Sequence, residues 1–347
     1  MKINKLFLAA LAGGLFFASC DSNDDNEAPL GSYDNGFLVL NEGGTGEVTY
    51  ISNDLQTVQQ DVFNVVNGDA HDLGTYTQSI FFDGDRAFVI SNGSNKITVV
   101  NRYTFEYIAT IDTGMVVPRY GVAYNGKAYV TNLNTFGSAT DDFITVINLA
   151  TLAVEDPIVV NTYADHIVAE GGNLYVAGGS FGSGDKVTVI NAATKTIVTA
   201  ITVGESPNSM EERNGILYVL CGSFAADSKV VRIDTDDNTI IDDVTFPNTM
   251  GNAQNLDIED GKIYFSVGPK VYKIATNAET VTDTPLFDTE STSGYIGYGF
   301  AVNGNKVYIS EAADDFSSDG KIFIYSTAGA FIDNITVGLG PNGFYFN

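Results

Sequence analysis

Hydrophobic and polar positions along the chain follow one short pattern that recurs seven times, a glycine-containing turn followed by a run of apolar residues. Asn-Gly-Lys-Ala-Tyr-Val from Asn125 and Asp-Gly-Lys-Ile-Tyr-Phe from Asp260 are two examples. A period of 42 to 48 residues, filled with strands and without helices, is typical of the blades of a β-propeller. The turn glycines that set this period are Gly36, Gly84, Gly126, Gly172, Gly215, Gly261 and Gly304.

Each repeat is predicted to hold four strands, because apolar and polar residues alternate with a period of two and β-branched residues are frequent. The repeated phrase is the second strand, and strand A comes directly before each turn. The first repeat, from Asp34, lacks a strand A, while the last strand A has no successor. We therefore expect an all-β, seven-bladed propeller over residues 34–347, closed by pairing of the C-terminal strand with the N-terminal blade. Strands A are expected at 78–82, 120–124, 166–169, 208–212, 255–259, 298–302 and 343–346.

The connections between strands are divided between the two faces of such a ring. Turns from the first to the second strand are short and rich in glycine, whereas loops from the second to the third strand are longer and more varied. Binding residues are commonly carried on loops that a rigid scaffold positions. We therefore expect function on the face that holds the longer loops.

Four of the longer loops place a phenylalanine among small residues. Two interpretations stay open: an apolar rim around the central opening, suited to holding a ligand or partner, and packing onto a neighbouring blade. The four residues are Phe136, Phe181, Phe224 and Phe316.

A ring of polar side chains is expected inside this rim, at the starts of strands A and the ends of two second strands. Its amide, phenol, carboxylate, imidazole and guanidinium groups suit a ligand rich in hydrogen-bonding groups. The alternative is that these groups solvate the channel and cap strand ends. The members are Glu42, Tyr76, Gln78, Arg119, Tyr120, Asn132, Asp165, His166, Asn208, Gln254, Asn255, Tyr298 and Asn342.

The N-terminal residues are predicted to be an export signal. Lys2 and Lys5 precede an apolar run over residues 6–18 that is too short to span a membrane. The ending Phe17-Ala18-Ser19-Cys20 resembles a bacterial lipobox, which implies cleavage after residue 19 and lipidation of Cys20. The alternative is a soluble exported protein with a chance cysteine. Residues 20–33 are polar and acidic and are expected to be a disordered tether, so the membrane is contacted only through the lipid.

The chain is strongly acidic, with 17 Lys and Arg against 43 Asp and Glu and a formal net charge of −26. This charge disfavours nucleic-acid binding, because phosphates would be repelled. Two accounts of it stay open: solubility at a crowded surface, and attraction of cations or of a basic partner.

Catalytic interpretations find little support in the sequence. His71 and His166 are the only imidazoles, and neither accompanies a nucleophile-elbow motif. No cofactor or metal is therefore expected, and the chain is predicted not to be an enzyme. The alternative is a metal-dependent hydrolase of the lactonase type, for which the available oxygen ligands would be Glu42, Asp165, Asn208 and Asn255.

Several segments resemble the YncE-like seven-bladed propellers, and most closely their Bacteroidetes lipoprotein branch. The resemblance covers residues 34–347 and rests on the segments 37–43 (FLVLNEG), 78–80 (QSI), 87–97 (AFVISNGSNKI) and 118–120 (PRY). It implies a binding role. Some members capture cobalamin at the cell surface and pass it to a TonB-dependent transporter of the outer membrane. Since this chain has no Trp, any stacking on a corrinoid would fall to Tyr and Phe.

The tether is similar to a localisation signal of that branch. In Bacteroidetes lipoproteins, an acidic stretch directly after the lipidated cysteine resembles the signal for the outer face of the outer membrane. Asp21, Asp24, Asp25 and Glu27 supply such a stretch here. The resemblance implies a surface-exposed outer-membrane lipoprotein, and the alternative is a plain solvated spacer.

Overall fold

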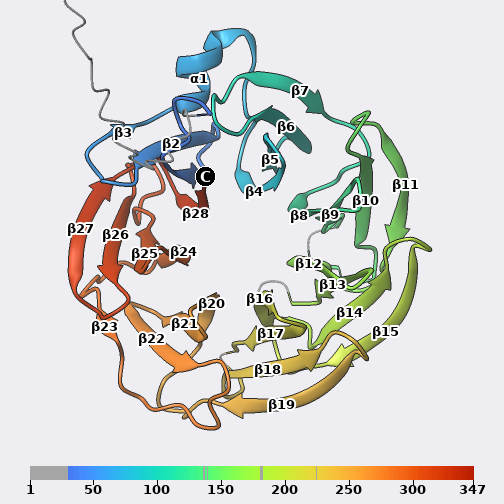
Figure 1. Ribbon diagram of the computed structural model, residues 1–347, viewed down its shortest axis with the longest axis vertical. Helices are drawn as coiled ribbons and strands as arrows, with labels where there is room; N and C mark the ends of the chain where they lie inside the picture. Colours follow the sequence, from blue (N-terminus) through green and yellow to red (C-terminus); the bar gives the residue numbers. More distant parts are fainter. Residues whose placement is uncertain (1–29, 136, 139, 180–182, 224) are drawn as a thin grey trace, which may run out of the picture.

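A computed structural model describes residues 30–135, 137–138, 140–179, 183–223 and 225–347. In it, seven four-stranded antiparallel sheets are arranged in a ring around a central axis (Figure 1). The predicted all-β, seven-bladed propeller is therefore confirmed. Blade 1 consists of β28, β1, β2 and β3, and blades 2 to 7 follow in chain order from β4 to β27.

The strands of each blade run from the axis outward. The inner strands, which correspond to the predicted strands A, are β28 (Pro341–Phe346), β4 (Thr77–Asp83), β8 (Pro118–Tyr124), β12 (Ile167–Glu170), β16 (Pro207–Arg213), β20 (Gln254–Glu259) and β24 (Ile296–Asn303). The second strands, which hold the repeated phrase, are β1 (Gly36–Asn41), β5 (Arg86–Ser91), β9 (Lys127–Asn132), β13 (Asn173–Ala177), β17 (Ile216–Cys221), β21 (Lys262–Val267) and β25 (Lys306–Glu311).

The third strands are β2 (Glu47–Ser52), β6 (Lys96–Asn101), β10 (Phe143–Asn148), β14 (Lys186–Asn191), β18 (Lys229–Asp234), β22 (Lys270–Ala275) and β26 (Lys321–Ser326). The outer strands are β3 (Val58–Gln59), β7 (Tyr107–Ile111), β11 (Val154–Val159), β15 (Thr196–Thr202), β19 (Thr239–Thr245), β23 (Phe287–Asp288) and β27 (Phe331–Thr336).

The C-terminal strand closes the ring, as predicted. Inner strand β28 pairs antiparallel with β1, and Leu38 lies opposite Tyr345. The last residue adds to this closure, because the Asn347 side chain donates to the carbonyl of Tyr33 at 2.6 Å. The two ends of the folded chain are thus tied together, and the first blade gains the strand that its own sequence lacks.

The hydrophobic core is divided into seven clusters, one between each pair of neighbouring blades. The second strands contribute to the clusters on both of their sides. In β1, Phe37 and Val39 face blade 7, while Leu38 and Leu40 face blade 2. Successive side chains of a strand point to opposite faces, so a strand that is buried on both faces has to be apolar throughout. This explains why the repeated phrase is a continuous apolar run.

One element departs from the expectation of strands alone. After the two-residue outer strand β3, the chain forms a short helix α1 (Val62–Asn67) and a 3₁₀ turn η1 (Gly68–Ala70). Val62 and Phe63 are buried in the cluster between blades 1 and 2. In blade 1 the helix therefore covers a part of the hydrophobic core that the short outer strand β3 does not reach. None of the helices in the described part of the chain is long and apolar enough to cross a membrane.

The predicted signal peptide and Cys20 lie outside the described residues. Tyr33, which was assigned to the tether, is buried against Tyr50 and Phe105, with ring centroids 5.1 and 6.3 Å apart. The folded part of the chain therefore includes Tyr33.

Candidate functional site

The polar candidates at the strand-A starts coincide with a recurring irregularity of the inner strands. In six of the seven blades, the pairing of the inner with the second strand slips near its start. Thr77 and Ser79, for example, lie opposite the consecutive residues Ser91 and Ile90, so Gln78 has no partner. The residues within these β-bulges include Gln78, Arg119, Tyr120, Asn208, Asn255, Tyr298 and Asn342.

The remaining blade shows a related arrangement. Ala177 of β13 accepts a hydrogen bond from the Asp165 amide at 3.0 Å and donates one to the His166 carbonyl at 2.9 Å. Bulges re-aim side chains and are over-represented next to active sites. Here they gather at one end of the channel, on the face that carries the longer loops.

A buried ion pair connects blades 2, 3 and 4 at this end of the channel. Nε of Arg119 donates to Oδ1 of Asp165 at 3.1 Å, and the guanidinium also donates to the side-chain oxygen of Gln78. The same Gln78 oxygen accepts a hydrogen bond from Asn92 at 2.9 Å. The side chains of Arg119 and Asp165 are only 13% and 9% exposed. These groups are therefore held in one geometry without much solvent.

Two aromatic rings lie against this ion pair. The imidazole of His166 stacks on the ring of Tyr120, with centroids 3.8 Å apart and planes 21° from parallel. The amide of Gln78 lies 3.4 Å from the Tyr120 hydroxyl, and the Arg119 guanidinium lies 5.5 Å from the ring centroid of Tyr120.

Burial sets the charge state of the network. It raises the pKa of Tyr120 to about 12, and it lowers the pKa of His166 below the ordinary value of 6.5. Burial acts to lower the pKa of Arg119, but the Asp165 carboxylate, together with Tyr120 and Glu42, outweighs it, and the pKa lies above its ordinary value. At neutral pH the network therefore consists of one internal ion pair and two uncharged rings.

A pocket of about 220 Å³ opens at the rim between blades 7, 1 and 2. Glu42, Tyr76 and Phe316 line it together with residues 43–44 and 339–340. Tyr76 is 52% exposed and Phe316 41% exposed. The carboxylate of Glu42 accepts a hydrogen bond from the Tyr298 hydroxyl. Burial raises the pKa of Tyr298 most, and the hydrogen bond to Glu42 raises it further, so the phenol stays protonated.

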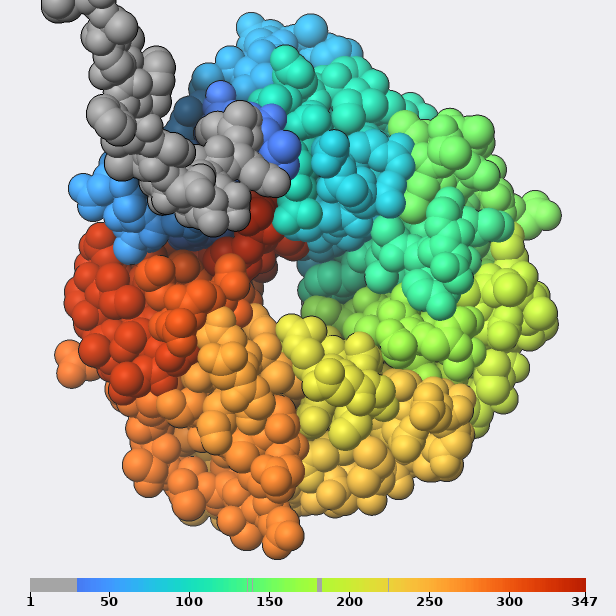
Figure 2. All heavy atoms as spheres, viewed as in Figure 1, coloured from blue at the N-terminus to red at the C-terminus, as the bar shows by residue number. Residues whose placement is uncertain are grey.

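The channel itself forms a further cavity of about 210 Å³ below the rim. Figure 2 shows the opening at the centre of the ring. Neutral hydrogen-bonding groups and aromatic rings line the cavity, among them Tyr120, His166, Asn208, Asn255, Tyr298 and Asn342.

Several predicted residues instead support the scaffold. Asn132 is fully buried, where its amide donates to Thr145 Oγ1 at 3.0 Å and its oxygen accepts the Val116 amide at 2.9 Å. The Asn208 side chain donates to the Ala253 carbonyl, in the loop between β19 and β20, at 2.9 Å. The Asn255 side chain donates to the Gly297 carbonyl of inner strand β24 at 2.8 Å. Asn132 therefore ties strands together, and the other two line the channel while linking blades.

The remaining candidates are placed as follows. Gln254 is solvent-exposed at the start of β20. Asn342 donates to the Thr77 carbonyl at 2.7 Å. Phe136, Phe181 and Phe224 lie outside the described residues, so both interpretations of these three stay open.

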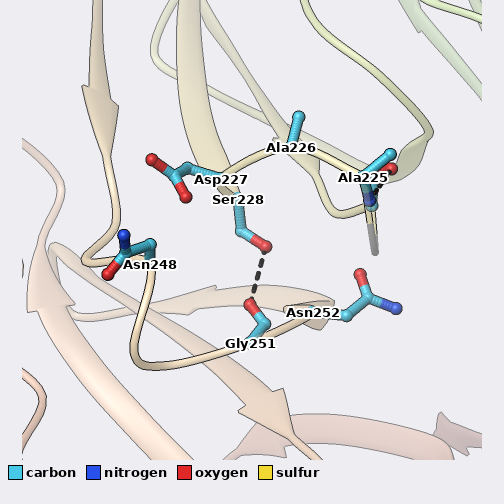
Figure 3. A pocket seen from close by; sticks show the side chains of 8 residues that line it. Ala225, Ala226, Asp227, Ser228, Asn248, Gly251 and Asn252 are labelled. Carbon is cyan, nitrogen blue, oxygen red and sulfur yellow. Dashed lines mark hydrogen bonds between the residues drawn. The ribbon is translucent and has the colours of Figure 1, made fainter.

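Sequence reasoning missed a pocket of about 200 Å³ between the loops of blades 5 and 6. Figure 3 shows its lining side chains on two loops that face each other, joined by a hydrogen bond from Ser228 to the Gly251 carbonyl at 3.1 Å. The lining consists of Ser223, Ala225, Ala226, Asp227, Ser228, Asn248, Gly251 and Asn252. Small and polar loop residues carry no periodic signal, so no sequence pattern pointed to this pocket.

The four residues considered as oxygen ligands for a hydrolase all make contacts within the protein. Asp165 pairs with Arg119, Tyr298 donates to Glu42, and the two asparagine amides donate to backbone. Within the described ranges, no group of three or more His, Cys, Asp or Glu side chains is placed to hold a metal ion.

A family model matches residues 35–346, and its description is "Domain of unknown function (DUF5074)". The chain belongs to this family. No curated protein matches the chain significantly. Membership of the YncE-like lipoprotein branch is a finer assignment that stays a prediction.

Solved structures share the fold of this DUF5074 chain at low sequence identity. A functionally unknown protein from Desulfotomaculum acetoxidans is 12% identical with a TM-score of 0.67, and the alignment covers 89% of this chain and 97% of that chain. A hypothetical selenium-binding protein from Sulfolobus tokodaii is 9% identical (TM-score 0.66; 89% and 91% covered). BamB from Moraxella catarrhalis is 12% identical (TM-score 0.55; 90% and 86% covered). At these identities the likeness concerns the fold alone.

The buried ion pair gives a stability prediction. Asp165→Asn leaves the Arg119 charge buried without its carboxylate, so we expect a loss of about 3–5 kcal/mol in the free energy of unfolding. Urea denaturation of Asp165→Asn, Arg119→Met and the double variant should show that the two single losses are not additive. The control is Asp243→Asn, which removes the more exposed 3.0 Å pair with Lys229 and should cost less than about 1 kcal/mol. Equal losses for Asp165→Asn and Asp243→Asn would contradict this account.

Proposed function

We propose that this chain is a non-enzymatic binding protein that takes a ligand at the channel mouth on the face of the longer loops. The observation that carries the proposal is the coincidence of the inner-strand bulges with the polar candidates. Extra residues in a strand cost ladder pairing, and six of the inner strands hold one or more at the same end. A buried polar network beside a pocket with two half-exposed aromatic rings is the arrangement expected of a pre-organised ligand site.

Backbone conformation at the rim supports this proposal. Tyr76 and Phe316 have φ angles of 53° and 45°, in the left-handed region that bulky residues rarely adopt. Such strain is common at ligand sites, where the surrounding structure holds it in place. In both residues the strained backbone presents a half-exposed ring to the rim pocket.

The finer proposal concerns ligand and location. A corrinoid is the lead ligand, and a TonB-dependent transporter of the outer membrane is the lead partner, because the sequence resembles YncE-like surface lipoproteins. The periphery of a corrinoid carries amides, which hydrogen-bond to phenol, amide and carboxylate groups like those of the mouth. A lipid on Cys20 would hold the propeller at the outer membrane, exposed at the cell surface.

Anchoring is tested by metabolic labelling of the full chain with a clickable fatty acid. The wild-type protein should be labelled and should fractionate with the outer membrane, whereas Cys20→Ala should be unlabelled and released. An unlabelled wild-type protein would refute the lipid anchor.

Ligand binding is tested by calorimetry with a panel of cobalamin, cobinamide, haem and glycans. We expect one class to bind, and the double variant Tyr76→Ala/Phe316→Ala to weaken its binding at least tenfold. Val198→Ala, an exposed residue of outer strand β15, is the matched control and should leave affinity unchanged. Binding that the double variant leaves intact would place the site elsewhere. No binding across the panel would instead favour a protein docking scaffold, to be tested by co-purification with the transporter.

A further inference from the structure

The rim pocket lined by Glu42, Tyr76 and Phe316 combines one carboxylate with two half-exposed aromatic rings. We propose that this pocket binds an organic ammonium group, held between the rings and neutralised by the carboxylate of Glu42. The inference rests on the proposed binding function and adds the chemical class of the group that enters this pocket. A small alkylammonium compound and a lysine side chain share this chemistry.

The anionic side of the pocket is fixed in position before any ligand arrives. The Glu42 amide donates to the Gly340 carbonyl at 2.8 Å, and its carbonyl accepts the Thr77 amide at 3.1 Å. Its Oε2 accepts the hydroxyl of Tyr298, whose ring also packs against the rim. A carboxylate that is already oriented loses little further freedom on binding a cation.

The aromatic side is equally constrained. Cδ2 of Tyr76 lies 2.5 Å from the place that a Cβ on Gly93 would occupy, so the ring rests directly on that glycine. Phe316 makes edge-to-face contacts with Tyr295 and Tyr298, at centroid distances of 4.6 and 5.8 Å. Ring faces attract cations, and pockets that combine several aromatic rings are a recurring means of recognising alkylammonium groups.

The surrounding charges favour a cation over an anion. The positive charge of Arg119 interacts with Glu42, but Arg119 is buried in its pair with Asp165. The whole chain carries a net charge of −26, which raises the concentration of cations near its surface. The sequence left two explanations of the acidic composition open, and the proposed site supports the one in which the chain attracts cations.

The test compares two probes of nearly identical shape, choline and its uncharged isostere 3,3-dimethyl-1-butanol. Binding of each to the full chain is measured by ligand-observed NMR titration at low salt. We expect choline to bind at least tenfold more tightly than the neutral isostere. Added NaCl should weaken the binding of choline and leave that of the isostere unchanged. An affinity for N-acetyl-lysine methylamide above that for choline would identify a lysine side chain as the natural source.

Variants separate charge from shape. Glu42→Gln retains an oxygen that can accept the Tyr298 hydroxyl, and it should lower choline affinity at least tenfold without changing that of the isostere. Glu106→Gln removes a solvent-exposed carboxylate in blade 2 and should change neither. Tyr76→Ala should weaken the binding of choline, because it removes one of the two aromatic rings. An unfolding midpoint that matches wild type establishes that a variant is folded. If Glu42→Gln is not folded, Glu42→Asp replaces it in the test.

Two results would overturn the inference. Equal affinities for choline and the isostere, both lost in Tyr76→Ala, would show a pocket that binds apolar groups without regard to charge. Absence of choline binding at millimolar concentration would remove the ammonium site altogether. In both cases the proposed function is judged separately, by whether Tyr76→Ala/Phe316→Ala weakens the panel ligand.

Discussion

The arrangement of the candidate site depends on the seven inner strands, which converge on one narrow axis. Six of these strands leave one or more residues out of the pairing ladder near their start, and the seventh bonds Asp165 and His166 to a single residue, Ala177. Residues released from pairing turn polar side chains toward the channel mouth. The Arg119–Asp165 pair, the Gln78 contacts and the Tyr120–His166 stack all follow from this irregularity. The candidate site is therefore built into the β-scaffold rather than into loops alone.

The repeated phrase serves the opposite purpose. Its side chains are distributed to the two clusters that flank each second strand, so almost every position is committed to the core. Substitution in this phrase would disturb packing between blades, because protein interiors tolerate little change in volume. What distinguishes one blade from another lies in the bulges and in the loops that follow the phrase, and these are the positions at which a ligand can be recognised.

The fold could be predicted because its signals are local and repeated: alternation, turn glycines, and a final strand without a successor. The short helix α1 was missed because it occurs once, in a segment that has no counterpart in other blades. The sequence pointed to the strand-A starts as candidates, yet it could not show that Gln78, Arg119 and Asp165 meet, since these contacts span three blades. Nor could it separate Asn132, which is fully buried, from residues that line the channel. Such distinctions depend on register, which a one-residue bulge changes.

The titration of His166 tests the central claim most directly. The chain contains only two histidines, so ¹⁵N-histidine NMR of the full protein gives two imidazole signals, and a His71→Gln variant assigns them. Burial beneath the mouth outweighs the nearby Asp165 carboxylate, and we predict a pKa for His166 below 6.5, with a neutral ring throughout the physiological range. Because the unfolded chain would bind this proton first, His166 would also lower stability as the pH falls below about 6.5. A pKa for His166 at or above 6.5 would contradict the buried polar network on which the account rests.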